Sequence, residues 1–194
     1  MCLHSCSCAG FSLIPLSLCS IAANILLYVP NGDPTYAANN QLSSYVLYFE
    51  GICFAGILML FPAAIFILLD HFEVCEPKNR NTKTWILLLA ALCGVAFSSY
   101  CVVISVLGLV QGPYCRTNIG WGHVFQSTNG GYLTDRSTWT QCLEPAQVVE
   151  WNVTLFSILL SLSGVEMILC FLQALKETAK LMNAKCASWE KVYC

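Results

Sequence analysis

Cysteine is the residue type with the most chemistry available in this chain, because a thiol forms disulfides, binds metal ions and accepts fatty acyl groups. There are thirteen cysteines among 194 residues. Near the N-terminus Cys2, Cys6 and Cys8 surround His4, a mixture of metal-ligand types. Two interpretations are open for this group, a metal site and a cluster of acylated cysteines, and its position relative to a membrane decides between them.

Three polar residues lie inside long apolar stretches: Asn24, Glu50 and Glu166. A carboxyl group in such a setting must be neutral or paired, because a bare buried charge is costly. One interpretation is a polar pocket for an ion, a proton or a sterol hydroxyl. The other is hydrogen bonding between helices that fixes their packing. No apolar stretch repeats acidic or basic residues along one face, as a conduction path requires.

The sequence contains no recognisable catalytic arrangement. His4, His71 and His123 are not spaced with a carboxylate or a nucleophile in a known pattern. There is no glycine-rich phosphate loop and no Cys-x-x-Cys pair. We therefore predict that the chain is not an enzyme and carries no cofactor.

Four long apolar stretches must position these groups. They cover about residues 9–29, 45–69, 85–110 and 153–173, and each is nearly free of charge. Each is about as long as the ~20 residues that a helix needs to cross a bilayer. The chain is 57% hydrophobic and 10% charged, with a net charge of −2, which gives no reason to expect nucleic acid as a partner. We predict one four-pass membrane domain covering residues 1–194.

The distribution of basic residues predicts the orientation. Only Arg116 and Arg136 lie on one side of the predicted membrane. The other side carries the remaining seven of the nine Lys and Arg residues: Lys78, Arg80, Lys83, Lys176, Lys180, Lys185 and Lys191. Because basic loops stay in the cytoplasm, both termini are expected there, and residues 30–44 and 111–152 are expected outside.

The predicted side of the membrane indicates the chemistry of each cysteine outside the spans. Cys115 and Cys142 are the two in the outer loops, where the compartment is oxidising, so we predict a disulfide between them. It would constrain the unfolded chain by roughly 3–4 kcal/mol in the entropy model. Cysteines near the inner surface are candidates for palmitoylation, which a flexible terminus at the membrane favours over metal binding: Cys2, Cys6, Cys8, Cys75 and Cys186.

Depth in the bilayer predicts which buried polar groups meet. At ~1.5 Å per residue, Asn24 and Glu50 both lie about 7–9 Å below the outer boundary and are close enough in depth to hydrogen-bond. Glu166 lies about 20 Å deep, at the level of Ser17 and Ser98. Ala90, Gly94 and Ser98 also form a stripe of small residues. Such a stripe serves bundle packing or a homodimer face, and we favour packing.

The larger outer loop, residues 111–152, is rich in aromatic residues and turn formers. Asn129, Gly130 and Gly131 predict a tight turn between short strands at 123–127 and 132–134. The aromatic residues form either a small core with an interface belt or a surface that recognises proteins. Asn152 begins the only glycosylation sequon, but it borders the fourth span, where access for the transferase is poor.

Several stretches resemble the L6 antigen family, the transmembrane 4 L six proteins. The resemblance spans about residues 9–173 and is carried by AANILLYVPNG at 22–32, SYC at 99–101, GPYC at 112–115, WTQCLEP at 139–145 and VEWNVTLFSILL at 149–160. It implies a plasma-membrane protein with a tetraspanin-like layout and no established enzymatic activity. One departure is that the loop between spans two and three has a single cysteine, Cys75, where relatives usually carry several.

We therefore predict an all-α integral membrane protein, a left-handed four-helix bundle with a small disulfide-closed outer loop. The resemblance implies a non-enzymatic organiser of adhesion, motility and proliferation that associates with membrane proteins such as integrins or tetraspanins. An alternative from another class is a sterol- or small-solute-handling protein that uses Asn24, Glu50 and Glu166. Membrane lipid, with or without sterol, is the other expected partner.

Overall fold

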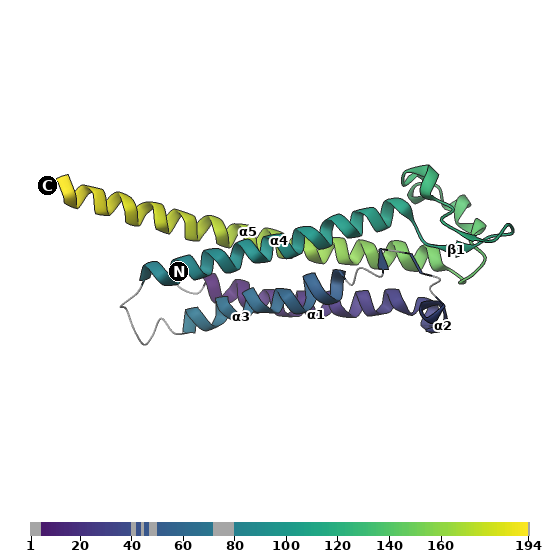
Figure 1. The fold of residues 1–194 in the computed structure, drawn as a ribbon, viewed down its shortest axis with the longest axis horizontal. Helices are drawn as coiled ribbons and strands as arrows, with labels where there is room; N and C mark the ends of the chain where they lie inside the picture. Colours follow the sequence, from purple (N-terminus) through teal and green to yellow (C-terminus); the bar gives the residue numbers. More distant parts are fainter. Residues whose placement is uncertain (1–4, 40–41, 44, 47–49, 72–79, 194) are drawn as a thin grey trace.

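The computed structural model describes residues 5–39, 42–43, 45–46, 50–71 and 80–193 (Figure 1). Its long helices are α1 (Ser5–Tyr28), α3 (Leu58–His71), α4 (Arg80–Gln111) and α5 (Val148–Tyr193). A π-helical segment, η3 (Glu50–Ile57), leads directly into α3. Four stretches are long and apolar enough to cross a bilayer, namely Cys8–Tyr28, Ile52–Asp70, Thr82–Gln111 and Val148–Asn183. The predicted fold class is confirmed.

Each helix of the bundle packs against the next in a ring. α1 contacts α3 and η3 on one side and α5 on the other, while α4 contacts α3 and, most extensively, α5. In Figure 1, α4 and α5 run along one side of the molecule and α1 and α3 along the other. The end of α5 lies at the opposite end of the bundle from the β1 region (Figure 1). The segment between α4 and α5 therefore lies at one end of the bundle, and the end of α5 lies at the other.

Glycines allow the helices to approach closely. A Cβ atom built on Gly94 of α4 would lie 2.5 Å from the Cys170 Sγ of α5, and one built on Gly108 would lie 2.6 Å from the Phe156 ring. Ala90 and Ser98 are also buried in the bundle. The predicted packing role of the small-residue stripe is confirmed, because small side chains let two backbones approach where lipid offers no hydrophobic driving force.

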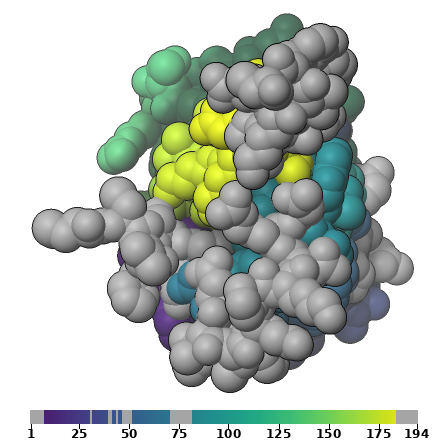
Figure 2. Space-filling view, turned by 90° about the vertical axis from the view of Figure 1, so that its left-hand side faces the viewer, coloured from purple at the N-terminus to yellow at the C-terminus, as the bar shows by residue number. Residues whose placement is uncertain are grey.

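The last helix continues well past the bilayer. α5 has 46 residues, which at ~1.5 Å per residue gives a length of about 70 Å, more than twice the ~30 Å hydrocarbon core. The chain after span four therefore continues the same helix. Near the inner end the Glu177 carboxyl is fully buried and accepts hydrogen bonds from Gln173 and Lys180, each at 2.8 Å. Figure 2 looks onto this end, where α5 lies beside α4.

The outer segments are short. Residues between α1 and η3 include η1 (Pro30–Gly32) and α2 (Thr35–Ala38). Between α4 and α5 lie the strands β1 (Cys115–Arg116) and β2 (Trp121–Gly122), followed by three 3-10 helices: η6 (Gln126–Thr128), η7 (Gly131–Leu133) and η8 (Arg136–Gln141).

The strands predicted at 123–127 and 132–134 were wrong, although a turn does lie between them. Asn129 and Gly130 have φ values of 47° and 83°, and they join two 3-10 helices rather than two strands. The strand pair forms earlier in the loop instead, next to the disulfide.

Candidate functional site

The segment between α4 and α5, residues 112–147, forms a small disulfide-closed unit that we call the outer mini-fold. The predicted disulfide between Cys115 and Cys142 is present, with the two Cα atoms 5.5 Å apart. β1 pairs with β2 in antiparallel register, Cys115 opposite Gly122. On the other edge of β1, Arg116 pairs with Glu144. The Arg116 amide donates to the Glu144 carbonyl at 2.9 Å, and the Leu143 amide donates to the Arg116 carbonyl at 2.8 Å. The hairpin is therefore held on both sides.

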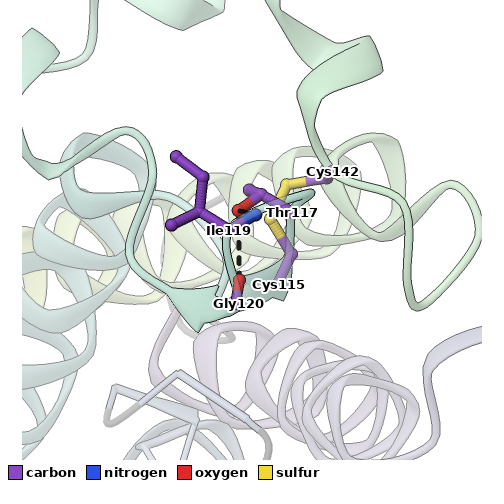
Figure 3. Close-up of a disulfide and its surroundings, with 5 residues drawn as sticks. All are labelled: Cys115, Thr117, Ile119, Gly120 and Cys142. Atoms are coloured by element: carbon purple, nitrogen blue, oxygen red, sulfur yellow. Dashed lines mark hydrogen bonds between the residues drawn. A yellow bond between two sulfur atoms is a disulfide. The ribbon is translucent and has the colours of Figure 1, made fainter.

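The hairpin turn is stabilised by its own hydrogen bonds. The Thr117 amide donates to the Gly120 carbonyl at 2.9 Å, and the Gly120 amide donates back to the Thr117 carbonyl at 3.2 Å. Gly120 has φ of +144°, a value that L side chains rarely adopt. At the tip the Ile119 side chain is 100% exposed, and Figure 3 shows it pointing away from the disulfide. A rigid turn thus presents one apolar side chain to its surroundings.

Aromatic rings surround the base of the hairpin. The rings of Tyr114 and Trp121 stack with centroids 5.9 Å apart, and His123 meets Tyr114 edge-on at 5.0 Å. Tyr36 from α2 approaches Trp121 at 6.4 Å, so the smaller outer loop also contributes. A cleft of about 190 Å³ lies along the hairpin and is lined by Ile119, Trp121 and His123 among others. Such aromatic rings are typical anchors in protein recognition.

Burial and hydrogen bonding lower the pKa of two titratable groups of the outer mini-fold, His123 and Asp135. Burial lowers the pKa of His123, whose Nδ1 atom is buried without a hydrogen-bond partner. The Asp135 carboxylate accepts hydrogen bonds from the Ser137 hydroxyl at 2.6 Å and the Ser137 amide at 3.0 Å, and these bonds lower the pKa of Asp135. The bond from the Ser137 amide caps the N-terminus of η8, so Asp135 has a structural role.

The outer mini-fold has its own core. The rings of Phe125 and Tyr132 stack at 4.5 Å, and both are almost fully buried. The Tyr132 hydroxyl donates to the Leu109 carbonyl near the end of α4 at 2.6 Å, and the Trp139 indole donates to the Tyr132 carbonyl at 2.8 Å. Burial raises the pKa of Tyr132 to about 12, so its hydroxyl stays a donor. The core interpretation of the aromatic residues therefore holds for this group.

Two further bonds lie near the outer ends of the helices: one joins α5 to α1, and the other joins α1 to the segment before η3. The Trp151 indole of α5 donates to the Leu26 carbonyl of α1 at 3.0 Å, and the Tyr28 hydroxyl donates to the Val46 carbonyl at 2.7 Å. Asn152 is 5% exposed, and its Oδ1 atom has no partner. This burial adds to the poor access predicted for the sequon, and glycosylation of Asn152 stays an untested prediction.

The buried polar groups of the bundle lie partly as expected. Ser17 and Glu166 meet as predicted, with Ser17 Oγ 3.5 Å from Glu166 Oε1. Ser17 also makes a shorter bond, 2.8 Å, to the Leu13 carbonyl. Asn24 is fully buried, and neither atom of its amide group has a partner. The predicted bond between Asn24 and Glu50 is untested, because the side chain of Glu50 lies outside the described residues.

The acylation candidates fall mostly outside the described part of the chain. Cys8 is exposed near the N-terminal end of α1. The other four candidates have no described side chain: Cys2, Cys6, Cys75 and Cys186. Among the residues that are described, no group of three or more His, Cys, Asp or Glu side chains is placed to hold a metal ion.

Sequence reasoning missed the central feature of this site. Nothing in the stretch from Cys115 to Gly122 alternates as a strand does, and Ile119 looked like one apolar residue among many. The signal that was available is the turn-forming run Thr117 to Gly120, which begins two residues after the disulfide cysteine Cys115.

Comparison with known proteins adds an independent finding. Residues 1–187 match the family described as L6 membrane protein. The chain is 51% identical over 179 residues to transmembrane 4 L6 family member 18 of Bos taurus, covering 90% of this chain and 89% of the relative. It is 46% identical over 200 residues to member 1 of Homo sapiens, covering 100% and 99%.

A more distant relative, member 4 of Rattus norvegicus, is 39% identical over 182 residues, which cover 90% of this chain and 89% of that protein. No solved structure matches. These relatives are named as membrane proteins of one family rather than as enzymes. With four membrane-spanning helices, the outer disulfide and a family match over nearly its whole length, the chain belongs to the L6 membrane protein family.

Proposed function

We propose that this protein is a non-enzymatic organiser of the plasma membrane, which binds neighbouring membrane proteins through its outer mini-fold. In this proposal both termini lie in the cytoplasm and the mini-fold lies outside, as the distribution of Lys and Arg indicates. Proteins such as integrins or tetraspanins, which the family resemblance implies, are the proposed partners. Palmitoylation of inner cysteines would favour ordered lipid domains.

The observation that carries this proposal is the hairpin tip. Ile119 is fully exposed on a turn that its hydrogen bonds, the neighbouring strand pairing and the disulfide all hold in place. A loop whose backbone is already ordered loses little conformational entropy on binding, so a small contact can contribute usefully to affinity. The cleft shared by Ile119, Trp121 and His123 gives that contact an aromatic border. The occupant that fits is an apolar pocket on the outer part of another membrane protein.

The test compares two charges placed one residue apart. Ile119→Asp removes the apolar contact, whereas Asn118→Asp adds the same charge at the neighbouring exposed position and keeps Ile119. Burying an Ile side chain is worth about 1.5–3 kcal/mol, so Ile119→Asp should weaken partner capture by about 10–100-fold. The measurement is cross-linking of surface membrane proteins in intact cells, followed by purification of this chain and quantification of the captured proteins.

The proposal predicts that Asn118→Asp captures the wild-type set and that Ile119→Asp loses it. A double variant, Cys115→Ser with Cys142→Ser, should capture less of the same set, because the hairpin would lose one of the constraints that hold it. If Ile119→Asp captures the same proteins as the wild type at the same yield, the mini-fold is not the binding surface.

A second candidate function is supported by the buried polar side chains of the bundle. Asn24 and Glu166 are fully buried, and they have unpartnered polar atoms: both amide atoms of Asn24 and Oε2 of Glu166. Such atoms normally find a partner, because an unsatisfied buried polar group costs about 1–3 kcal/mol. A sterol hydroxyl or a small polar solute between α1 and α5 would supply one. Glu50 belongs to the same hypothesis by its depth alone.

Photolabelling with a reactive sterol separates this candidate from the first. The hypothesis predicts that Glu166→Gln and Asn24→Leu each reduce labelling of the bundle, while Ser161→Ala, on the exposed side of α5, leaves it unchanged. Equal labelling of all variants would reject sterol binding at this position. Folding is checked in parallel by the formation of the outer disulfide.

A further inference from the structure

A small cavity lies where the outer segments meet the bundle. Its volume is about 20 Å³, and its walls come from four parts of the chain: the end of α1, the residues before η3, the link from α4 to β1, and the first turns of α5. Leu27, Val46, Pro113 and Trp151 supply much of the apolar wall. The volume matches the ~10–15 Å³ that one water molecule needs.

Two residues that line this cavity, Ser43 and Asn152, each carry a buried polar atom without a hydrogen-bond partner. Ser43 is 3% exposed and Asn152 is 5% exposed, and neither Ser43 Oγ nor Asn152 Oδ1 has a hydrogen-bond partner. The two residues are 109 positions apart in the sequence, yet both line the same space. Buried polar atoms are satisfied in nearly all proteins by a protein group or by ordered water.

We propose that this cavity binds one ordered water molecule, which donates a hydrogen bond to Asn152 Oδ1 and forms a second with Ser43 Oγ. The water would connect the smaller outer loop to α5 at the base of the outer mini-fold. Two direct bonds lie at the same junction, from Trp151 to Leu26 and from Tyr28 to Val46. The water therefore adds a third link at this junction, between the smaller outer loop and α5. This inference does not depend on the proposed function.

The proposal gives Asn152 a structural role apart from its sequon. The two roles are separable, because Thr154→Ala removes the sequon and leaves both water-binding side chains in place. Thr154 is exposed, so its replacement disturbs no packing. This variant serves as the matched control, since it reports any effect of a lost glycan on stability.

The test is whether each of two substitutions in the full chain raises or lowers the apparent Tm. If water bridges the two atoms, Ser43→Ala and Asn152→Leu each remove one hydrogen-bond partner of the water. Each should therefore lower the apparent Tm by about 2–4 °C. The double variant should fall by less than the sum of the two, because both act on the same water molecule. Thr154→Ala should match the wild type in Tm.

If the cavity is dry, the expected change in Tm is not a decrease. Each single substitution would then remove an unsatisfied polar atom and would raise the Tm or leave it unchanged. A high-resolution map gives the direct observation, with density for a single water within hydrogen-bond distance of Ser43 Oγ and Asn152 Oδ1. The proposal is overturned by an empty cavity in that map, or by single variants that are as stable as the wild type.

Discussion

Replacing Gly108 with alanine tests the packing of α4 on α5 directly. A Cβ atom at this position would lie 2.6, 2.7 and 3.0 Å from three atoms of the Phe156 ring. Carbon atoms in contact normally stay about 3.5–4.0 Å apart, so the ring or the helix must move by roughly 1 Å. Phe156 is fully buried, and Leu155 and Leu159 pack in the same cluster, so the ring has little room to move.

Overpacking of this kind costs about 1–3 kcal/mol, which for a chain of this size lowers the Tm by roughly 2–12 °C. Gly164→Ala in α5 is the matched control, because a Cβ there would meet nothing within 4 Å. That control should keep or slightly raise the Tm, since alanine favours a helix over glycine by about 1 kcal/mol.

Thermal unfolding of the purified chain in lipid nanodiscs measures both variants. A second-site change, Phe156→Leu, should recover part of the loss in Gly108→Ala, because the smaller side chain makes room for the new methyl group. The packing argument is refuted if Gly108→Ala and Gly164→Ala have the same Tm. It is also refuted if Phe156→Leu adds its full cost on top of Gly108→Ala.

Three further outcomes are expected of the outer mini-fold. Replacing both Cys115 and Cys142 with serine should lower its unfolding free energy by about 3–4 kcal/mol, and pulse proteolysis of the outer loop measures the change. Tyr132→Phe should cost about 1–2 kcal/mol in thermal unfolding, because the Leu109 carbonyl loses the donor that lies 2.6 Å away. Burial lowers the pKa of His123 below its usual 6.5, so the unfolded chain binds more protons in acid. Stability should therefore fall as the pH drops below about 6.5, and His123→Gln should remove that slope in pH-dependent unfolding.

The membrane architecture was readable from sequence because the bilayer imposes simple rules. Long uncharged runs predicted the spans, and the side of each cysteine predicted that Cys115 pairs with Cys142. Depth along the helices also placed Ser17 level with Glu166, and the two side chains do meet. Each of these inferences needs only one coordinate, the position along the membrane normal.

Features that depend on positions within the membrane plane, or on the folding of the loops, could not be predicted. Gly108 faces Phe156 because of the rotation of two helices about their axes, which no residue count reveals. The hairpin that presents Ile119 has strands of two residues each, too short to show alternation. The cavity at Ser43 closes only when four separate segments come together, so the sequence carries no sign of it.

Photo-crosslinking from position 119 in intact cells tests the central claim most directly. A photoreactive residue is placed at Ile119 in one variant and at Gln126, an exposed position of η6 outside the hairpin, in another. The account predicts covalent adducts with other membrane proteins from position 119 and few from position 126. Adducts from position 126 alone, or no protein adduct from position 119, would contradict it.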